Sequence, residues 1–327
     1  MVRAIVIEEG DGGVSTRVSE VDESELPEGD VVVDVSYSTV NYKDALAMVR
    51  GKPVVGSFPM VPGIDFVGTV ATSGSAAWKP GDGVILNGWG VGERRWGGLA
   101  ERARVEADWL VAQPASLSAR DCMVIGTAGY TAMLSVMLLE EQGVDPGSGP
   151  VLVTGATGGV GSVAVAVLAG LGYEVLAATG KATEEPYLRS LGASAVVDRS
   201  ELSGDVRPLA KQRWAAAIDN VGSVVLANVL AATSYGGTVI ACGNAGGMDL
   251  PSSVAPFILR GVRLVGVESV MAPIAQRRTA WQRLATELPA SARDAMAVDV
   301  DLAGAIDVAH KMLAGETRGR YAVDVHA

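Results

Sequence analysis

Cysteine and histidine are scarce in this chain, which limits the covalent and metal chemistry open to it. The 327 residues include two cysteines, Cys122 and Cys242, and two histidines, His310 and His326. Two cysteines far apart in sequence cannot form a disulfide framework or a four-cysteine zinc lobe. We therefore expect both cysteines to be buried apolar residues and both histidines to be surface or packing residues.

Basic charge and long apolar runs are lacking as well. Lys and Arg number 26 against 37 Asp and Glu, giving a formal net charge of −11. Duplex binding needs a basic surface, so nucleic acid is not an expected partner, although a local basic pocket could hold a phosphorylated ligand. The most apolar run, residues 163–179, is interrupted by Gly170, Gly172 and Glu174, which does not favour a membrane span. The first residues lack the apolar stretch of a signal peptide, so we expect a cytoplasmic protein.

Apolar residues are plentiful, at 49% of the chain, and they follow two different patterns. Residues 1 to about 120 hold short β-branched segments between prolines and glycines, which predict a partly open β-barrel. Strands are expected there at 3–7, 30–40, 64–71, 84–87 and 99–105. From residue 151, six apolar segments alternate with helical ones, at 151–154, 174–179, 195–198, 215–219, 237–242 and 263–267. Such alternation is typical of a doubly wound parallel sheet, so the chain is predicted to be an α/β protein.

Helices are expected between and after these strands. Residues 119–143 predict a helix broken near 126–129, where glycines interrupt an Ala- and Leu-rich stretch. The tail carries amphipathic patterns around 279–286 and 302–313 and ends in a strand-like segment at 320–325. The length and the change of pattern near residue 119 together suggest two domains.

A glycine-rich turn follows the first strand of the second region. Residues 151–161 read VLVTGATGGVG, so the fingerprint has the form A-x-G-x-x-G, on Ala156, Gly158 and Gly161. Glycines let the main chain turn tightly beside a pyrophosphate, and the N-terminus of the next helix favours negative charge. Such a turn could also bind nothing, but its place after the first of six strands indicates a dinucleotide site.

The end of the second strand indicates NADP in preference to NAD. An NAD site usually places Asp or Glu there, to accept a hydrogen bond from the ribose 2′-OH. Here the residues are Thr179, Gly180 and Lys181, which suit a 2′-phosphate. In a 3-2-1-4-5-6 sheet the third strand lies beside the second, so Arg199 could bind the same phosphate. The alternative is that Lys181 and Arg199 are ordinary solvated loop charges.

Four motifs in a fixed order resemble the medium-chain dehydrogenase/reductase family. They are GIDFVGTV at 63–70, KPGDGV at 79–84, GTAGYTA at 126–132 and GATGGVG at 155–161. The resemblance covers the whole chain. It implies a GroES-like catalytic domain formed by residues 1–122 and 269–327, and a Rossmann NADP-binding domain at 123–268.

Further segments resemble the zinc-free, quinone-oxidoreductase-like branch and, within it, NADPH-dependent reductases of acrylyl-CoA. They are VNYKDA at 40–45, NGWGVGE at 87–93, WGGLAE at 96–101, ACGNAGG at 241–247 and PFILRGVRL at 256–264. Zinc-dependent members carry a Cys after the second strand and a His-Glu pair in the glycine motif. Here those places hold Thr39 or Asn41, and Ile64 with Asp65. Catalytic zinc needs three protein ligands, so the resemblance implies that no metal is bound.

The resemblance also implies which residues hold NADPH. Tyr42 lies near the nicotinamide, and the pyrophosphate is held by Thr157, Gly158, Gly159 and Val160. The 2′-phosphate ribose is held by Thr179, Gly180, Lys181 and Arg199, and the nicotinamide half by Asn244, Ile258 and Ser269. Two positions depart from the family pattern, since Lys181 stands where arginine is frequent and Asn244 where an apolar residue can occur.

The implied reaction is NADPH-dependent reduction of the activated C=C bond of an α,β-unsaturated acyl-CoA, such as acrylyl-CoA to propionyl-CoA. Hydride goes to the β-carbon, and the α-carbon is then protonated. Tyr42 is the candidate for hydrogen bonding or proton delivery, with Asn41 and Asp44 orienting it. An equal alternative is that Tyr42 only packs beside the nicotinamide.

Two arginine pairs are candidates for the CoA phosphates, namely Arg94 with Arg95 and Arg277 with Arg278, although a solvated loop is the preferred interpretation of each.

Alternative functions are reduction of quinones or enones and, in another class, an NADP-binding sensor without catalysis. The resemblance further implies a homodimer, formed by edge pairing of the last sheet strand near 263–267.

Overall fold

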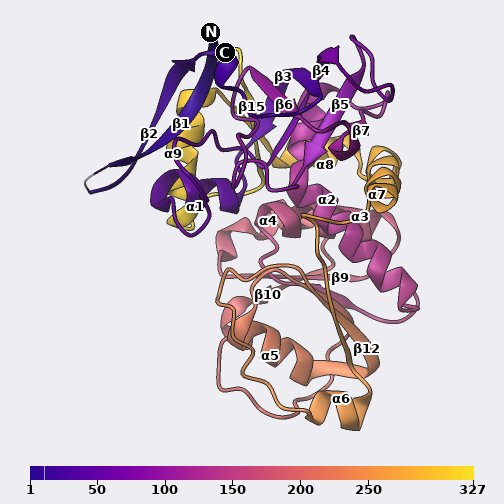
Figure 1. Cartoon of the computed structure of the whole chain (residues 1–327). Helices are drawn as coiled ribbons and strands as arrows, with labels where there is room; N and C mark the ends of the chain where they lie inside the picture. The colour runs from indigo at the N-terminus through magenta and orange to yellow at the C-terminus, as the bar shows by residue number, and fades with distance from the viewer. Residues whose placement is uncertain (11) are drawn as a thin grey trace. The chain divides into compact units, whose positions relative to one another are not determined.

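The computed structural model describes residues 1–10 and 12–327, which form two compact units (Figure 1). Unit 1 comprises Met1–Thr127, Ser269–Ala285 and Met296–Ala327, and unit 2 comprises Ala128–Glu268 and Thr286–Ala295. The chain thus leaves unit 1 after Thr127, returns to it at Ser269, and passes through unit 2 once more at Thr286–Ala295. The predicted assignment of catalysis to residues 1–122 and 269–327, and of NADP binding to residues 123–268, stays a prediction.

Unit 1 is built on a seven-stranded sheet with the order β14-β15-β3-β4-β5-β7, and β6 also pairs with β3. Its strands are β3 (Val31–Thr39), β4 (Asp65–Ser73), β5 (Gly83–Asn87), β6 (Arg102–Val105), β7 (Val111–Ala112), β14 (Ala297–Val300) and β15 (Arg320–Asp324). All pairs are antiparallel except β14 with β15. The pairing of Ala322 with Thr39 brings the C-terminal strand beside β3.

A separate antiparallel pair joins β1 (Val2–Gly10) to β2 (Gly13–Val21). The apolar pattern predicts β1 but not β2, because β2 reads GVSTRVSEV and no residue in it is fully buried. Short 3₁₀ turns connect other strands of the unit, at Glu23–Glu25 (η1) and Ala107–Trp109 (η2).

Two helices, α1 (Tyr42–Arg50) and α9 (Leu302–Leu313), pack against each other in unit 1. The apolar pattern predicts α9 with these bounds, and Asp301 caps it by accepting from the main-chain N–H of Gly304 at 2.7 Å. Helix α1 is not predicted as a helix. Its signal is a capping box, in which Asn41 precedes the first turn and Asp44 stands three residues later.

Unit 2 contains a six-stranded parallel sheet with the order β10-β9-β8-β11-β12-β13, which is the predicted 3-2-1-4-5-6 arrangement. Its strands are β8 (Val151–Val153), β9 (Val175–Thr179), β10 (Ala195–Asp198), β11 (Trp214–Asp219), β12 (Thr233–Ala241) and β13 (Arg263–Gly266). The predicted doubly wound sheet is therefore confirmed.

Helices cover both faces of this sheet. Helices α3 (Gly159–Gly170) and α4 (Glu185–Ser190) lie on one side and α5 (Ser223–Ala232) on the other (Figure 1). The connections also include α6 (Ala255–Arg260), η3 (Ala182–Glu184) and η4 (Arg199–Leu202). Buried Leu152, Trp214 and Val229 belong to the core between the sheet and α5.

Helix α2 (Ala119–Glu141) crosses from one unit to the other and is interrupted at Gly126, which has φ +51° and ψ −160°. A Cβ there would lie 2.4 Å from Nη2 of Arg320 and 2.9 Å from Oδ2 of Asp65, so a side chain does not fit. Among the described residues α2 is the one helix with the length and apolarity of a membrane span, and 83% of its most apolar window is buried inside the protein.

The tail adds α7 (Ile274–Glu287) and α8 (Ala290–Met296). Helix α7 begins five residues before the predicted amphipathic segment, and its buried residues Ala280, Trp281 and Leu284 form the expected apolar face. Nothing in the apolar pattern predicts α8, whose seven residues are too few to show a helical period.

Candidate active site

The glycine-rich turn between β8 and α3 presents main-chain N–H groups at the carboxyl end of the unit 2 sheet. Gly155 adopts φ +57°, and Gly158 caps α3. A Cβ on Gly161 would lie 2.4 Å from the carbonyl oxygen of Gly155, so only glycine lets the helix pack this closely. The first N–H groups of a helix have no partner within it, and this end suits a phosphate. The residues predicted for the pyrophosphate, Thr157, Gly158, Gly159 and Val160, all lie in this turn.

A basic corner forms where β9 and β10 end side by side, with Asp198 opposite Thr179 in the register. The guanidinium of Arg199 lies over Gly180, since a Cβ on Gly180 would be 3.0 Å from Cζ of Arg199. The hydroxyl of Thr179 accepts from the N–H of Lys181 at 3.1 Å. A guanidinium, a lysine and main-chain N–H groups beside a glycine are the groups that recognise a phosphate.

A buried polar network ties the ends of β8 and β11 together, and sequence patterns do not reveal it. Thr154 Oγ1 donates to Asp219 Oδ1 at 2.7 Å, and Asn220 Nδ2 donates to the carbonyl of Thr154 at 2.7 Å. Burial raises the pKa of Asp219. The one local signal that could have indicated this network is the Asp219-Asn220 pair at the end of β11. The network stabilises the edge of the sheet at which dinucleotides bind in this fold.

The two cysteines differ in their surroundings. Cys122 is buried, as predicted. The prediction for Cys242 needs correction, because this residue is half-buried and its thiol lies 3.2 Å from Oδ1 of Asn220. Burial raises the pKa of the Cys242 thiol to about 12, so it is not a nucleophile at neutral pH.

Residues predicted for the nicotinamide half lie in both units. Asn244 follows β12 and is exposed, and Ile258 is 73% exposed on α6. Ser269 and Tyr42 belong to unit 1. Their joint contact with one cofactor stays a prediction.

In unit 1, the start of α1 is fixed by the side chains of Asn41 and Asp44. Asp44 Oδ2 accepts from the N–H of Asn41 at 2.9 Å, and Asp44 Oδ1 accepts from the N–H groups of Gly63 and Ile64 at 3.0 and 2.9 Å. Tyr42 comes next and is 46% exposed, so its phenol is accessible while the main chain beside it is held.

A buried cluster of charges lies behind this helix start. Arg320 Nη1 donates to Oδ1 of Asn41 at 3.1 Å, and Nη2 donates to Oγ1 of Thr39 at 2.9 Å. Asp65 Oδ2 accepts from Nδ2 of Asn41 at 3.1 Å and from the N–H of Thr127 at 2.6 Å. Sequence reasoning misses Arg320, because nothing near it in sequence marks it as more than a strand residue.

Burial sets the protonation of this cluster. It raises the pKa of Asp44 to about 7, with the neighbouring carboxylate of Asp65 acting in the same direction. It also raises the pKa of Asp65, although the charge of Arg320 opposes that shift. The pKa of Arg320 is lowered by burial. The charges of two buried carboxyl groups, Asp44 and Asp65, thus act on the one buried guanidinium of Arg320.

The cluster does not fit zinc. Thr39 or Asn41, and Ile64 with Asp65, are the positions at which the sequence resemblance implies zinc ligands in metal-dependent members, and the guanidinium of Arg320 already binds the side-chain oxygens of Thr39 and Asn41. A second cation there would face a fixed positive charge. Among residues 1–10 and 12–327, no three His, Cys, Asp or Glu side chains are grouped so that they could hold a metal ion.

The four arginines that were candidates for binding the CoA phosphates differ in their exposure to solvent and in their contacts. Arg94 is exposed, while Arg95 lies 5.0 Å from the ring of Trp109. Arg278 is exposed, but the interpretation of Arg277 as a solvated loop charge is wrong, because it is 1% exposed. Its position on the inner face of α7 explains the burial.

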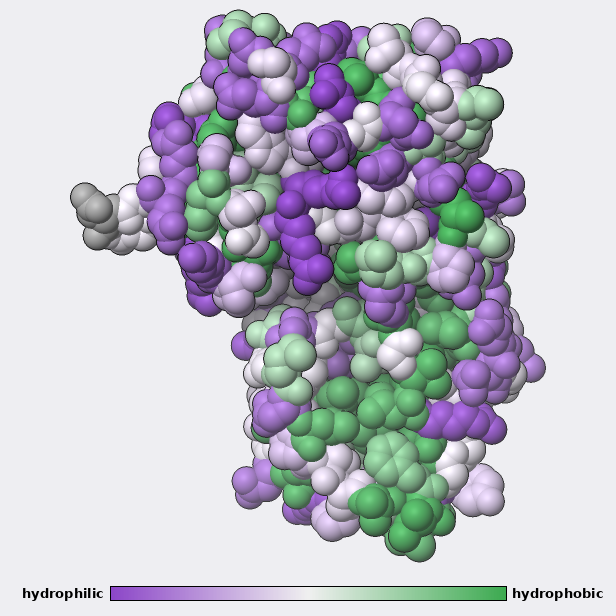
Figure 2. Space-filling model, in the orientation of Figure 1, coloured by the Kyte–Doolittle hydropathy of each residue, from purple (hydrophilic) through white to green (hydrophobic). Residues whose placement is uncertain are grey.

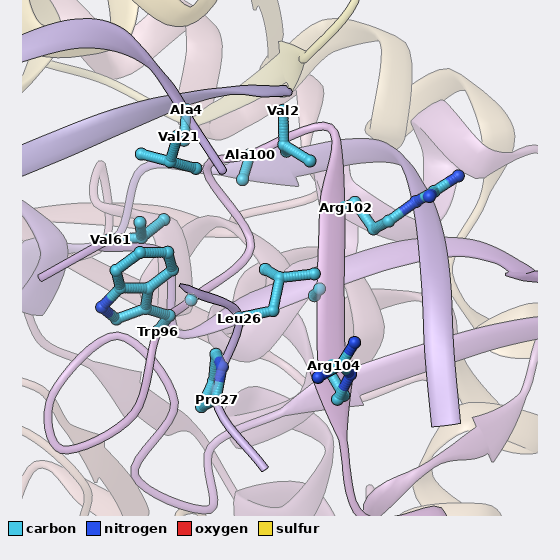
Figure 3. A pocket seen from close by; sticks show the side chains of 12 residues that line it. Val2, Ala4, Val21, Leu26, Pro27, Val61, Trp96, Ala100, Arg102 and Arg104 are labelled. Carbon is cyan, nitrogen blue, oxygen red and sulfur yellow. The ribbon is translucent and has the colours of Figure 1, made fainter. Parts of the chain in front are cut away.

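A small apolar crease in unit 1 is a different feature. Leu26, Val61 and Trp96 lie around it, with Arg102 and Arg104 at its side (Figure 3). No residue predicted to bind the cofactor lines it. The crease is therefore not part of the candidate site.

Comparisons with known proteins agree with this arrangement. The family described as "Alcohol dehydrogenase GroES-like domain" matches residues 27–115, and "Zinc-binding dehydrogenase" matches residues 159–286. Acrylyl-CoA reductase AcuI of Ruegeria pomeroyi is 50% identical over 330 residues, covering 100% of both chains. The expected GroES-like and Rossmann architectures are confirmed.

Solved structures extend the comparison to the whole fold. The crystal structure of Escherichia coli K-12 YhdH with bound NADPH is 54% identical, with a TM-score of 0.96, covering 98% of this chain and 99% of that one. Bacillus subtilis YhfP, crystallised with NAD, is 40% identical, with a TM-score of 0.95 and 99% of each chain covered. On identity and coverage at this level, the chain belongs to the medium-chain dehydrogenase/reductase family, in its quinone-oxidoreductase-like branch with the acrylyl-CoA reductases.

Proposed function

We propose that this protein is an NADPH-dependent reductase of the C=C bond of α,β-unsaturated acyl-CoA, with acrylyl-CoA as substrate and propionyl-CoA as product. The observation that carries the proposal is the full-length identity of 50% to an acrylyl-CoA reductase. The basic corner at Gly180 and Arg199 supports NADPH as the cofactor, because NAD has no 2′-phosphate to bind there.

Residues of both units are proposed to hold NADPH. Thr157 to Val160 bind the pyrophosphate, and Thr179 to Lys181 with Arg199 bind the 2′-phosphate. Tyr42, Asn244, Ile258 and Ser269 line the nicotinamide half. When bound, NADPH supplies a hydride for the β-carbon of the substrate.

The protein's own contribution is orientation, exclusion of water and proton delivery. The thioester carbonyl already activates the alkene, so no metal is required in this mechanism. After hydride addition, the enolate of the substrate takes a proton at its α-carbon, and Tyr42 is the proposed donor. Asn41 and Asp44 support Tyr42 by holding the first turn of α1.

Steady-state kinetics test the proposal. The value of kcat/KM is measured with NADPH for acrylyl-CoA, crotonyl-CoA, a quinone and a free enone. We expect acrylyl-CoA to be preferred, and its ratio to crotonyl-CoA to report the size of the pocket. A higher value for the quinone would favour the alternative function of the branch. Tight NADPH binding without turnover of any activated alkene would favour an NADP-binding sensor.

The proposal includes a homodimer in the cytoplasm, with no membrane or nucleic-acid partner. Strand β13 is the last in the order of the unit 2 sheet, which leaves an edge for a second copy. Apolar atoms gather on unit 2 around the place of α6 and β12 (Figure 2). Exposed side chains there include Tyr235, Val254, Ile258 and Leu259. Light scattering of Leu259→Asp tests this interface, because a monomer is expected for that variant and a dimer for the native chain.

A further inference from the structure

Arg277 is a buried cation that donates hydrogen bonds to four main-chain carbonyl groups. It is 1% exposed. Nε donates to the carbonyl of Ala272 at 2.9 Å, and Nη2 donates to those of Ser269 and Val270 at 3.2 and 2.6 Å. Nη1 donates to the carbonyl of Asn87. The segment 269–272, by which the chain returns to unit 1, is thus bound by the helix that follows it.

The side chain of Asn87 extends the same cluster. Its Oδ1 accepts from Nε1 of Trp281 at 3.0 Å, and its Nδ2 donates to Oγ1 of Thr127 at 3.2 Å. Thr127 is the last residue of unit 1 before the chain leaves it, and Ser269 is the first after it returns. Two of the four points at which the chain passes between units, after Thr127 and before Ser269, therefore end on one set of residues, which we name the crossing clamp: Asn87, Trp89, Arg277 and Trp281.

The main chain within the clamp is strained and closely packed. Trp89 adopts φ +58°, a conformation that is unfavourable for a non-glycine residue and persists only where its surroundings enforce it. Its N–H donates to the carbonyl of Val270 at 3.0 Å, and its ring lies 4.4 Å from the guanidinium of Arg277. A Cβ on neighbouring Gly88 would lie 2.7 Å from the oxygen of Val270. Such enforced geometry is a feature of functional sites.

We propose that Arg277 is a positioning residue for hydride transfer, acting through the carbonyl groups of Ser269 and Val270. It holds Ser269 in place within the same unit as Tyr42. This inference rests on the proposed function, in which Ser269 lines the nicotinamide half and Tyr42 serves the substrate. Gly180 and Arg199 belong to unit 2, so we expect the clamp to act on the nicotinamide half and not on the 2′-phosphate corner.

The test compares Arg277→Met and Arg277→Lys with the control Gln276→Met, which alters an exposed residue of the same helix. Dissociation constants are measured for NADPH and for adenosine 2′,5′-bisphosphate, which has the 2′-phosphate but no nicotinamide. The rate of hydride transfer is measured in a single turnover. A displacement of about 1 Å costs on the order of a hundredfold in rate, so we expect a loss of at least about tenfold in Arg277→Met and less in Arg277→Lys.

The affinity for the bisphosphate is expected to stay unchanged in both variants. Native hydride-transfer rates in folded Arg277→Lys and Arg277→Met would overturn the inference, as would equal weakening of both ligands. If Arg277→Met does not fold, Trp281→Phe removes one bond of the clamp and keeps the ring, and the same selective loss is expected. A different result would contradict the proposed function, namely that the native protein does not reduce acrylyl-CoA. In that case the Arg277 variants are tested with any activated alkene that the native protein does reduce.

Discussion

The guanidinium of Arg320 donates to the side-chain oxygen of Asn41 at 3.1 Å, across 279 positions of sequence. Through this bond the last strand of the chain supports the residue that precedes Tyr42. The same guanidinium donates to Oγ1 of Thr39, one of the positions at which the sequence resemblance implies a zinc ligand in metal-dependent members. Its charge also opposes the rise in the pKa of Asp65.

Removal of the Arg320 charge should destabilise unit 1. In Arg320→Met the buried carboxyl group of Asp65 loses its compensating charge, and breaking a buried pair in this way costs about 3–5 kcal/mol. Denaturant unfolding measures the loss. The double variant Asp65→Asn with Arg320→Met should recover part of it, and exposed Arg318→Met should change the free energy of unfolding by less than about 0.5 kcal/mol. An Arg320→Met protein of native stability would show that the pair contributes nothing.

Tyr42→Phe separates proton delivery from packing. If the phenol donates the proton, kcat with acrylyl-CoA should fall by about a hundredfold, because general acid catalysis contributes on that order. The KM for NADPH should change little, since the ring remains. Tyr235→Phe, on the exposed surface of unit 2, is the control. Retention of full kcat in Tyr42→Phe would leave this residue only a packing role.

Arg199→Ala should weaken NADPH and not NADH. A hydrogen bond to a charged group contributes about 1.5–3 kcal/mol, which corresponds to roughly a tenfold to hundredfold rise in the dissociation constant of NADPH. NADH lacks the phosphate, so its affinity should be unaffected. Exposed Arg207→Ala is the matched control. Equal weakening of both cofactors would place Arg199 elsewhere in the binding reaction.

Asp44 should make stability depend on pH in an unusual direction. Its pKa is about 7 in the folded protein against 3.8 for an unperturbed Asp side chain, so between these values the folded state keeps a proton that the unfolded state releases. The contribution of Asp44 to the free energy of unfolding therefore falls as pH rises toward 7 and is constant above it.

Thermal unfolding at several pH values from about 5 to 8 tests this, with Asp44→Asn as the variant that cannot titrate. The stability of the native protein relative to Asp44→Asn should decline from about pH 5 to 7 and level off above pH 7. A relative stability that rises with pH would mean that the folded carboxyl group has a depressed pKa, contrary to the effect of its burial.

The sequence by itself determined the α/β architecture and the turn that suits a phosphate. Six apolar segments with helices between them predict a doubly wound parallel sheet, and the glycine-rich turn after the first strand favours the 3-2-1-4-5-6 order of dinucleotide-binding proteins. Ala156, Gly158 and Gly161 predicted the turn, because small residues at this spacing let the main chain turn tightly and pack closely. Local signals also marked Thr179 to Lys181, and the sheet order placed Arg199 beside them.

Only the tertiary structure decided what surrounds Asn41 and Ser269. Arg320 reaches Asn41 from the other end of the chain, and Arg277 binds carbonyl groups that carry no sequence signature. Helix α1 is not predicted, because its nine residues are too few to show a clear helical period and its other signal is the hydrogen-bonded cap of Asn41 and Asp44. Burial and hydrogen bonding of charged groups depend on distances between remote segments, and a linear pattern of apolar residues cannot supply these.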